Sequence, residues 1–330
     1  MAEVKRPPTG AKLRVVAIGA GKMANMVHYP SLASLSEVTI AGICDRHPDR
    51  LHATADHYAI AGRYADYRQM IEELAPDAVY AIGQPDVMYP VWTWCLEHGL
   101  NLYVEKPLGL TLHQARALAY LADKHGCVTQ VSFQRRTCPM VVQLRDACLQ
   151  RGPIVHAICR FYKCQIEPYL EARDHMLDDG VHAIDTLRWL CGGEVSDVAS
   201  ITHQVRVPDT NFISALLRFD NGATGILVNS WSSGRRIFAV EMHAPGICAE
   251  GEHEGLGHLY ADGDTQGVTY DTRVIAGSDE LYVYGGFQAK HREFVECLRA
   301  RRQPASNFAD ALKTMEVAHR ILAQATLASV

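Results

Sequence analysis

Short apolar runs alternate with longer segments of mixed polarity through residues 13–133 of this 330-residue chain. Each run has the length of a buried strand, and each segment between two runs has apolar residues at helical spacing. This alternation predicts a doubly wound parallel sheet, an α/β architecture. The expected strands are residues 13–18, 37–44, 77–82, 100–104 and 127–133, and the expected helices are residues 25–35, 48–58, 68–74, 86–98 and 111–125, with Asp66 and Thr111 as caps.

The pattern changes near residue 132. From Glu194 onward polar and apolar residues alternate with period two, and Asp220-Asn221-Gly222 predicts a hairpin turn in which Asn and Gly supply positive φ angles. We expect a first domain of residues 1–131 and a second, α+β domain of residues 132–330 with a large open, mainly antiparallel sheet. The expected helices are residues 139–150, 287–302 and 308–328, and the expected strands are residues 154–163, 195–205, 212–219, 223–230 and 237–243.

The first expected strand leads directly into Gly19-Ala20-Gly21-Lys22-Met23-Ala24 and then into a helix. Gly19 permits a tight turn, Gly21 lets a pyrophosphate approach the backbone, and Ala24 lets the helix pack closely on the strand. The unpaired N–H groups at the helix start form an anion site. The arrangement predicts a Rossmann dinucleotide-binding domain, with Lys22 and Met23 also at the cofactor.

The acidic residue that ends the second strand bears on the choice of dinucleotide. Asp45 lies about 20 residues past the glycines, where a carboxylate accepts hydrogen bonds from an adenosine ribose. Its charge repels a 2′-phosphate, which favours NAD as the cofactor. Arg46 can stack on adenine or pair with that phosphate, so NADP stays open as the alternative.

Composition excludes some classes of partner. The chain is 48% hydrophobic and 21% charged, and its net charge of −5 gives no reason to expect nucleic acid or an anionic membrane. Residues 1–12 form a polar lead-in without the apolar segment of a signal peptide, and no stretch has the length of a membrane span. We therefore expect a cytoplasmic protein that acts on a small molecule.

Cysteine and histidine spacing gives little support to a metal. The ten cysteines are scattered without a C-x-x-C pair, which predicts reduced, mostly buried thiols. His253 and His258 have H-E-x-x-x-H spacing in a glycine-rich stretch, so the two rings would not share a helix face. A hairpin is the preferred interpretation there, and no metal is expected.

A second polar cluster is expected on the helix that contains residues 177–190. At helical spacing Asp178, His182 and Asp185 share one face. This stretch alone fits an acidic, solvated first turn equally well. Lys106, in Glu105-Lys106-Pro107 at the carboxyl edge of the first sheet, favours a catalytic role, because a lysine beside a nicotinamide can take the proton of a substrate hydroxyl.

Together these motifs, with Gln84-Pro85-Asp86 and Gln134-Arg135-Arg136, resemble the glucose-fructose oxidoreductase, inositol dehydrogenase and rhizopine-catabolism (Gfo/Idh/MocA) family over nearly the whole chain. The resemblance implies a Rossmann domain, an α/β domain whose open sheet is used for oligomerisation, and tightly held NAD or NADP. It also implies hydride transfer on sugars, cyclitols or related alcohols.

The resemblance also implies residue roles. Lys106 and His182 would be catalytic, Asp178 would act with them and orient the substrate, and Asp185 would support the site. A cis Lys106–Pro107 peptide is implied as well. The further cofactor residues implied are Gln84, Pro85 and Glu105.

Two departures from the family pattern border the expected substrate site. Tyr89 stands where the family has a histidine, and residues 171–176 replace a run of glycines. We expect a pocket of different shape, so no relative's substrate is transferred to this chain.

Substrate contacts are expected at Arg136, Lys163, Asp178, Asp185 and Trp231, with Tyr162 also near, because polyhydroxylated ligands stack on Trp and pair with cations. For Arg136, Tyr162, Lys163 and Trp231, an ordinary core aromatic or surface cation is an equal alternative.

The predicted function is hydride transfer between a nicotinamide and a secondary alcohol of a sugar, glycoside or cyclitol. One alternative is an NAD-dependent glycoside hydrolase or lyase that oxidises its substrate transiently. A second is a non-catalytic NAD-binding sensor. The open sheet is expected to pair copies of the chain into a homodimer or homotetramer.

Overall fold

The computed structural model describes residues 11–169 and 174–327, which form two compact units. Unit 1 contains the described chain up to Ser132 together with Phe287–Asp310, and unit 2 contains Phe133–Gly286 and the described chain from Ala311 onward. Most of the expected lead-in, residues 1–12, lies outside the described residues, as do residue 170 and the first half of the divergent insert, residues 171–173.

Unit 1 is built on a six-stranded sheet in the order β3-β2-β1-β4-β5-β6, with every neighbouring pair parallel. This is the strand order of a dinucleotide-binding Rossmann domain. The strands are β1 (Leu13–Ile18), β2 (Val38–Cys44), β3 (Gly62–Tyr64), β4 (Ala78–Ala81), β5 (Leu102–Val104) and β6 (Thr129–Val131). The predicted doubly wound sheet is confirmed, with β3 as an additional edge strand.

The helices of unit 1 follow the predicted order. The helix after β1 contains the π-helical segment η1 (Ala24–His28) and continues as α1 (Tyr29–Ala33). Asp66 and Thr111 cap their helices as predicted, each accepting a backbone N–H. The other helices are α2 (Pro48–His57), α3 (Tyr67–Leu74), α4 (Pro85–Glu97), α5 (Leu112–Lys124) and α10 (Phe287–Ala300).

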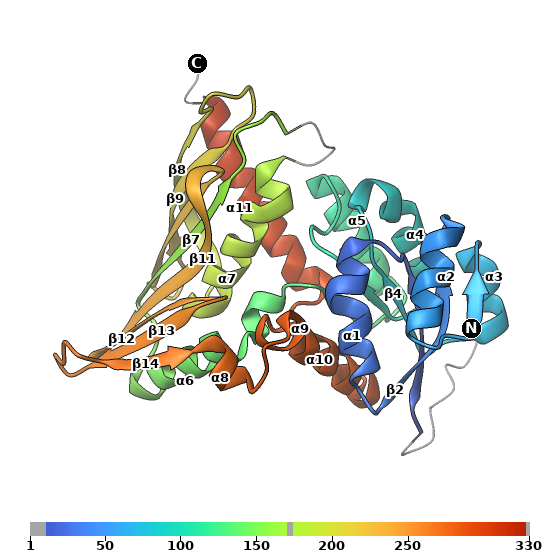
Figure 1. Cartoon of the computed structure of the whole chain (residues 1–330). Helices are drawn as coiled ribbons and strands as arrows, with labels where there is room; N and C mark the ends of the chain where they lie inside the picture. Colours follow the sequence, from blue (N-terminus) through green and yellow to red (C-terminus); the bar gives the residue numbers. More distant parts are fainter. Residues whose placement is uncertain (1–10, 170–173, 328–330) are drawn as a thin grey trace. The chain divides into compact units, whose positions relative to one another are not determined.

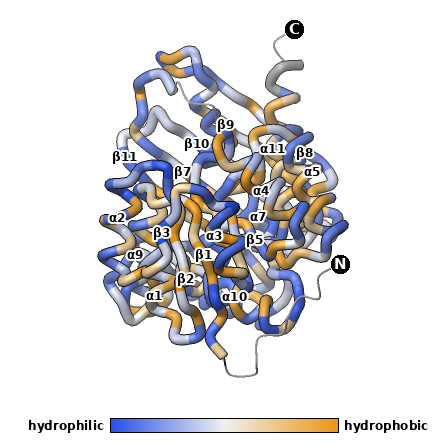
Figure 2. Tube along the Cα trace, turned by 90° about the vertical axis from the view of Figure 1, so that its right-hand side faces the viewer, coloured by the Kyte–Doolittle hydropathy of each residue, from blue (hydrophilic) through white to orange (hydrophobic). Residues whose placement is uncertain are grey.

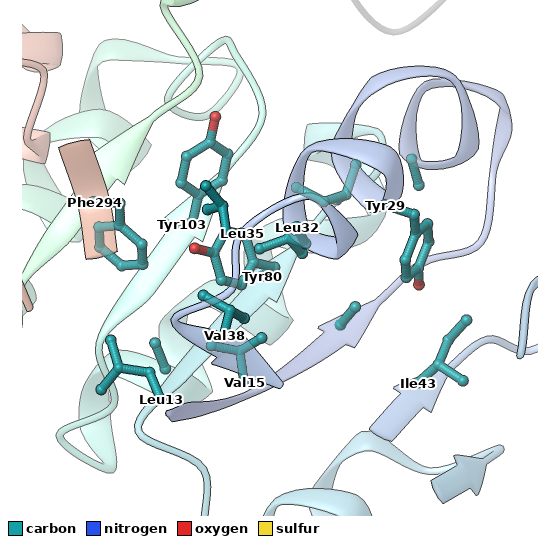
Figure 3. Packing of buried hydrophobic residues seen from close by; sticks show 14 of the residues in the cluster. Leu13, Val15, Tyr29, Leu32, Leu35, Val38, Ile43, Tyr80, Tyr103 and Phe294 are labelled. Atoms are coloured by element: carbon teal, nitrogen blue, oxygen red, sulfur yellow. The ribbon is translucent and has the colours of Figure 1, made fainter. Parts of the chain in front are cut away.

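Helix α10 returns to unit 1 although more than 150 residues separate it from β6. Its Phe294 packs edge-on against the rings of Tyr80 and Tyr103, with centroids 5.6 Å from each (Figure 3). Strand β1 supplies Leu13 and Val15 to the same core and is hydrophobic along most of its length (Figure 2). Burial of these apolar side chains stabilises the sheet on which the glycine turn rests.

Unit 2 contains an eight-stranded, mainly antiparallel sheet in the order β14-β13-β12-β11-β7-β10-β9-β8, in which only β7 and β10 pair in parallel. Its strands are β7 (His156–Cys164), β8 (Val195–His203), β9 (Phe212–Phe219), β10 (Thr224–Ser230), β11 (Ser232–Ala244), β12 (Ile247–Glu252), β13 (Leu256–Ala261) and β14 (Val268–Asp271). The predicted α+β domain with a large sheet is confirmed.

The helices of unit 2 that pack on this sheet lie on one of its faces (Figure 1). Residues along the strands alternate accordingly: Ala157, Cys159 and Phe161 of β7 are buried beneath the helices, and the residues between them point to the other face. The helical segments are η2 (Gln134–Thr137), α6 (Pro139–Arg151), η3 (Met176–Gly180), α7 (Val181–Cys191), α8 (Thr272–Ala276), α9 (Leu281–Tyr284) and most of α11 (Phe308–Leu327).

Some local details differ from the predictions. The hairpin at residues 220–222 forms, but only Gly222 has a positive φ, since a three-residue turn needs one left-handed residue rather than two. Strand β11 begins at Ser232, five residues before the expected start. The hairpin preferred over a metal site near His253 is confirmed, because β12 and β13 pair antiparallel.

Candidate active site

The glycine turn after β1 has the geometry that its sequence predicts. Gly19 has φ +104°, and a Cβ there would lie 2.0 Å from the carbonyl oxygen of Ile82, so only glycine fits. No atom lies within 4 Å of a Cβ position at Gly21, which leaves the backbone open to a ligand. Ala24 is buried and lets the helix approach the sheet, while Lys22 and Met23 are exposed at the helix start.

Side chains from the following helix brace this turn. The Asn25 amide donates to the carbonyl oxygens of Ala20 and Gly21 at 2.9 and 3.2 Å. The Tyr29 hydroxyl donates to the carbonyl oxygen of Gly19 at 3.0 Å. Because these bonds hold the carbonyls, the turn keeps its shape without a ligand.

Asp45 lies at the carboxyl end of β2 and contacts the glycine turn directly. Its carboxylate accepts the N–H of Ala20 at 2.7 Å and the N–H of His47 at 2.8 Å. A carboxylate fixed beside the turn matches the residue that binds an adenosine ribose in this fold. The open backbone at Gly21 and the fixed Asp45 therefore fit NAD, and Arg46 is exposed beside them.

A buried chain of polar side chains leads to Glu105. The His28 ring contacts a Glu105 carboxylate oxygen at 2.7 Å through Nε2 and the Nε2 of His291 at 2.9 Å through Nδ1. All three side chains are buried. Burial raises the pKa of Glu105, but the hydrogen bond and charge of His28 outweigh it and leave the pKa below its usual value of 4.5. The carboxylate is thus held ionised inside unit 1.

Glu105 in turn fixes the residue that follows it. The backbone N–H of Lys106 donates to the second Glu105 oxygen at 3.2 Å, and the Lys106–Pro107 peptide is cis, as the resemblance implied. Gln84 and Pro85 begin α4 after the carboxyl end of β4. The loops that follow β1, β2, β4 and β5 share the carboxyl edge of one parallel sheet, where such sheets bind ligands.

In unit 2, the acidic residues and His182 lie at the start of one helix. Residues 176–180 are π-helical and run directly into α7. Asp178 is half-buried, whereas Asp179, His182 and Asp185 are buried. Short π-helical segments within helices are frequent at functional sites.

Two of the residues expected to contact the substrate form an ion pair with each other. The Arg136 guanidinium donates to both carboxylate oxygens of Asp185, at 2.7 and 2.5 Å, and both side chains are buried. Such a two-pronged pair fixes the orientation of both groups. The geometry favours a positioning role for the pair, which joins η2 to α7, and substrate contact by either residue stays a prediction.

Asp179 accepts hydrogen bonds from two other residues that were expected to contact the substrate. Its Oδ2 accepts from Lys163 Nζ at 2.5 Å and from the Trp231 indole at 3.0 Å. The His175 ring stacks between Tyr169 and Trp231, at 4.7 and 4.5 Å, and burial lowers its pKa. Lys163 and Trp231 are therefore fixed near the start of α7, and their contact with a substrate stays a prediction.

Sequence reasoning missed Asp179 and the partners of Glu105. The Asp178-Asp179 doublet contained the signal, but helical spacing alone assigned the polar face to the first aspartate. His28 and His291 are 263 residues apart, and no local pattern pairs them. Among the described residues no group of three His, Cys, Asp or Glu side chains is arranged to hold a metal ion.

Two further findings concern the chain as a whole. All ten cysteines are free thiols and all except Cys164 and Cys248 are buried, as predicted. In the part of the chain that the structure describes, no helix combines the length and the apolar character needed to cross a membrane.

Comparison with known proteins defines the class first. Residues 13–133 match the family model described as "Oxidoreductase family, NAD-binding Rossmann fold", and residues 156–244 match the family's C-terminal domain. Both matches are to a family of NAD-binding oxidoreductases. The chain belongs to the Gfo/Idh/MocA family, as its motifs indicated.

Similar proteins include sugar and cyclitol dehydrogenases. The chain is 27% identical to D-glucoside 3-dehydrogenase of Escherichia coli (strain K12) over 199 residues, which are 57% of each protein. It is 23% identical to scyllo-inositol 2-dehydrogenase (NAD(+)) of Bacillus subtilis (strain 168), covering 93% of this chain and 92% of that one. The crystal structure of a dehydrogenase from Chromobacterium violaceum has the same fold, with TM-score 0.88, 20% identity and 97% of each chain covered. The alignment with the E. coli glucoside dehydrogenase, by contrast, spans little more than half of that protein.

Replacing Glu105 by glutamine should lower the free energy of unfolding by about 2 kcal/mol at pH 7, because it removes a charged hydrogen-bond acceptor from a buried network. The Glu105 pKa is lowered in the folded chain, so its ionisation stabilises the fold above the usual carboxyl pKa. That contribution disappears as the pH falls through the folded value. Urea unfolding of both proteins between pH 3 and 7 should therefore show a difference in the free energy of unfolding that becomes smaller at acidic pH. The exposed His113, changed to glutamine on α5, is the control. A difference in the free energy of unfolding that does not change with pH would contradict a stabilising role of Glu105 ionisation.

Arg136→Met should lower the free energy of unfolding by about 3–5 kcal/mol, because it leaves the Asp185 carboxylate buried without its main partner. The double variant Arg136→Met/Asp185→Leu should recover most of that loss in chemical denaturation. The exposed pair Arg151–Asp262, broken by Arg151→Met, is the matched control and should change stability little. If Arg136→Met abolished substrate affinity with stability intact, direct substrate binding would be the better explanation.

Proposed function

We propose that this protein catalyses the reversible oxidation of a secondary alcohol on a sugar, glycoside or cyclitol, with NAD as the hydride acceptor. The observation that carries the proposal is the placement of Lys106 beside the buried Glu105, at the carboxyl edge of the NAD-binding sheet. The sugar and cyclitol dehydrogenases among the similar proteins support the substrate class.

The residues of unit 1 would hold the cofactor and one catalytic group. Asp45 would accept the ribose hydroxyls and the open backbone at Gly21 would admit the pyrophosphate. NAD, when bound, supplies the acceptor for the carbinol hydrogen. Lys106, held by Glu105, would hydrogen-bond the substrate hydroxyl and favour its deprotonated form.

The residues of unit 2 would handle the proton. His182 would take the hydroxyl proton as general base, and Asp178 would hold a neighbouring hydroxyl and stabilise the resulting imidazolium. The Arg136–Asp185 pair fixes the helix one turn beyond His182. Asp179, held by Lys163 and Trp231, fixes the turn before it.

Lys106→Ala and His182→Ala should each lower turnover by roughly 100-fold or more, since each removes a proton-handling group. NAD binding, measured by calorimetry, should be unchanged.

The substrate would be identified by the change in nicotinamide absorbance during incubation with sugars, glycosides and cyclitols. Product formed without any net absorbance change would favour the redox-neutral hydrolase or lyase, and NAD binding without turnover of any substrate would favour the sensor. Full activity in either variant would overturn its assigned role.

We also propose that a second copy of the chain covers the helix-free face of the unit 2 sheet. Ile201 of β8 and Leu216 of β9 lie on that face, 61% and 51% exposed. The face also carries both signs of charge, with Arg160 on β7 and Glu241 on β11. A two-fold interface pairs one face with itself, which suits a surface that holds both charges and apolar side chains.

Leu216→Glu should reduce the molar mass measured by light scattering, because it places a charge in the proposed interface. The control is Val274→Glu on α8, where the valine is 77% exposed and lies outside the sheet. The control should keep the wild-type mass. A monomeric wild type, or an unchanged mass for Leu216→Glu, would contradict pairing through this face.

A further inference from the structure

Arg135 is a buried arginine whose charged group lies against aromatic rings. It belongs to η2, at the start of unit 2, and is 7% exposed. Its guanidinium carbon lies 3.7 Å from the ring centroid of Phe238 and 5.2 Å from that of Phe161. The two rings pack against the guanidinium but offer its N–H groups no charged acceptor.

The hydrogen-bonding edge of this guanidinium has no acceptor among the described residues. Nε is sealed from solvent without a hydrogen-bond partner, and no hydrogen bond or ion pair joins the terminal nitrogens to another described residue. The nearby carboxylate of Asp179 is held by Lys163 and Trp231. Arg135 therefore lacks the direct counter-charge that Arg136, its neighbour in the chain, finds in Asp185.

The surroundings of Arg135 do not compensate for this lack. Burial lowers its pKa to about 10, which still leaves it charged at neutral pH. The His253 ring packs 5.0 Å from Phe238, and burial together with the charge of Arg135 lowers the pKa of His253 well below its usual value. A neutral imidazole supplies no negative charge. A buried cation is costly unless it is paired, so a partner that arrives with a ligand would relieve the cost.

Arg135 lies on the segment that packs against the catalytic helix of unit 2. Phe133, two residues earlier, contacts the His182 ring edge-on at 6.1 Å. Lys163 Nζ lies 5.3 Å from the centroid of Phe161, the same ring that Arg135 approaches. The unneutralised guanidinium thus belongs to the cluster that contains His182 and the Asp179 contacts.

We propose that Arg135 binds an anionic group carried by the substrate, a carboxylate or a phosphate, so that the oxidised alcohol belongs to a sugar acid or a sugar phosphate. The proposal rests on the proposed function for the oxidation itself. The fork of an arginine matches the paired oxygens of either anion. Arg135 is then a specificity residue, which binds a part of the substrate remote from the reacting carbon.

The first experiment compares matched substrates. Wild type and Arg135→Gln are assayed by NADH formation with D-glucose, D-glucuronate and D-glucose 6-phosphate, and with inositol and inositol phosphate. We expect the wild type to prefer an anionic member, and Arg135→Gln to lower kcat/KM for that member by about 30-fold, as loss of a charged hydrogen bond does. The neutral member should change by less than about threefold. A preference for D-glucuronate would indicate a carboxylate site, and a preference for a phosphorylated substrate would indicate a phosphate site.

The matched control is Arg145→Gln on α6. The Arg145 guanidinium also lies on an aromatic ring, 4.5 Å from the Trp189 centroid, so this variant removes a similar stacking contact. It should leave the preference for anions intact. A wild type that prefers the neutral member, or an Arg135→Gln variant that loses neutral and anionic activity equally, would overturn the proposal.

The second experiment needs no turnover. Calorimetry measures the binding of inorganic phosphate and of malonate to the NAD-loaded wild type and to both variants. Arg135→Gln should weaken binding of one anion about 30-fold, and Arg145→Gln should not. Anion binding that depends on Arg135, without oxidation of any substrate, would support the anion site while the proposed function fails. Binding that is absent, or equal in Arg135→Gln, would overturn the anion site even if the enzyme oxidises neutral sugars.

Discussion

Buried carboxylates set the positions of the functional side chains in both units. Glu105 is buried next to Lys106, and Asp185 is buried one turn beyond His182. An ionised group removed from water must be paired and hydrogen-bonded, and the pairing fixes its direction. In the proposed mechanism, the rigidity that proton transfer needs thus comes from charges that take no part in the transfer.

The buried carboxylate is paired differently in the two units. In unit 1 the carboxylate of Glu105 is bound by His28, whose other ring nitrogen contacts His291. In unit 2 Asp185 has a full counter-charge in Arg136. A π-helical segment lies beside each arrangement, at residues 24–28 and 176–180. Each adds backbone length within a helix and shifts which side chains share a face.

This shift explains what the sequence could and could not predict. The glycine turn, Asp45 and the alternation of strands and helices in unit 1 follow from short local patterns, so the sequence predicts them from single segments. The face shared by Asp178, His182 and Asp185 was derived from regular helical spacing, and the π-helical residues break that spacing; Asp179 is buried and Asp178 only half-buried. Strands β12 to β14 are not predicted because all three are short, and β12 and β13 each contain a glycine. No local rule assigns residues 287–310, placed in the second domain from the sequence, to unit 1.

The return of that segment connects the sheet of unit 1 to a part of the chain that is distant in sequence. Helix α10 brings Phe294 onto Tyr80 and Tyr103, and the same helix places His291 against both of these rings and against His28. Burial lowers the pKa of His291 well below its usual value, so the ring is neutral. Aromatic packing therefore does more than fill the core. It buries His291, whose ring contacts His28, and His28 in turn binds the Glu105 carboxylate that accepts the Lys106 N–H.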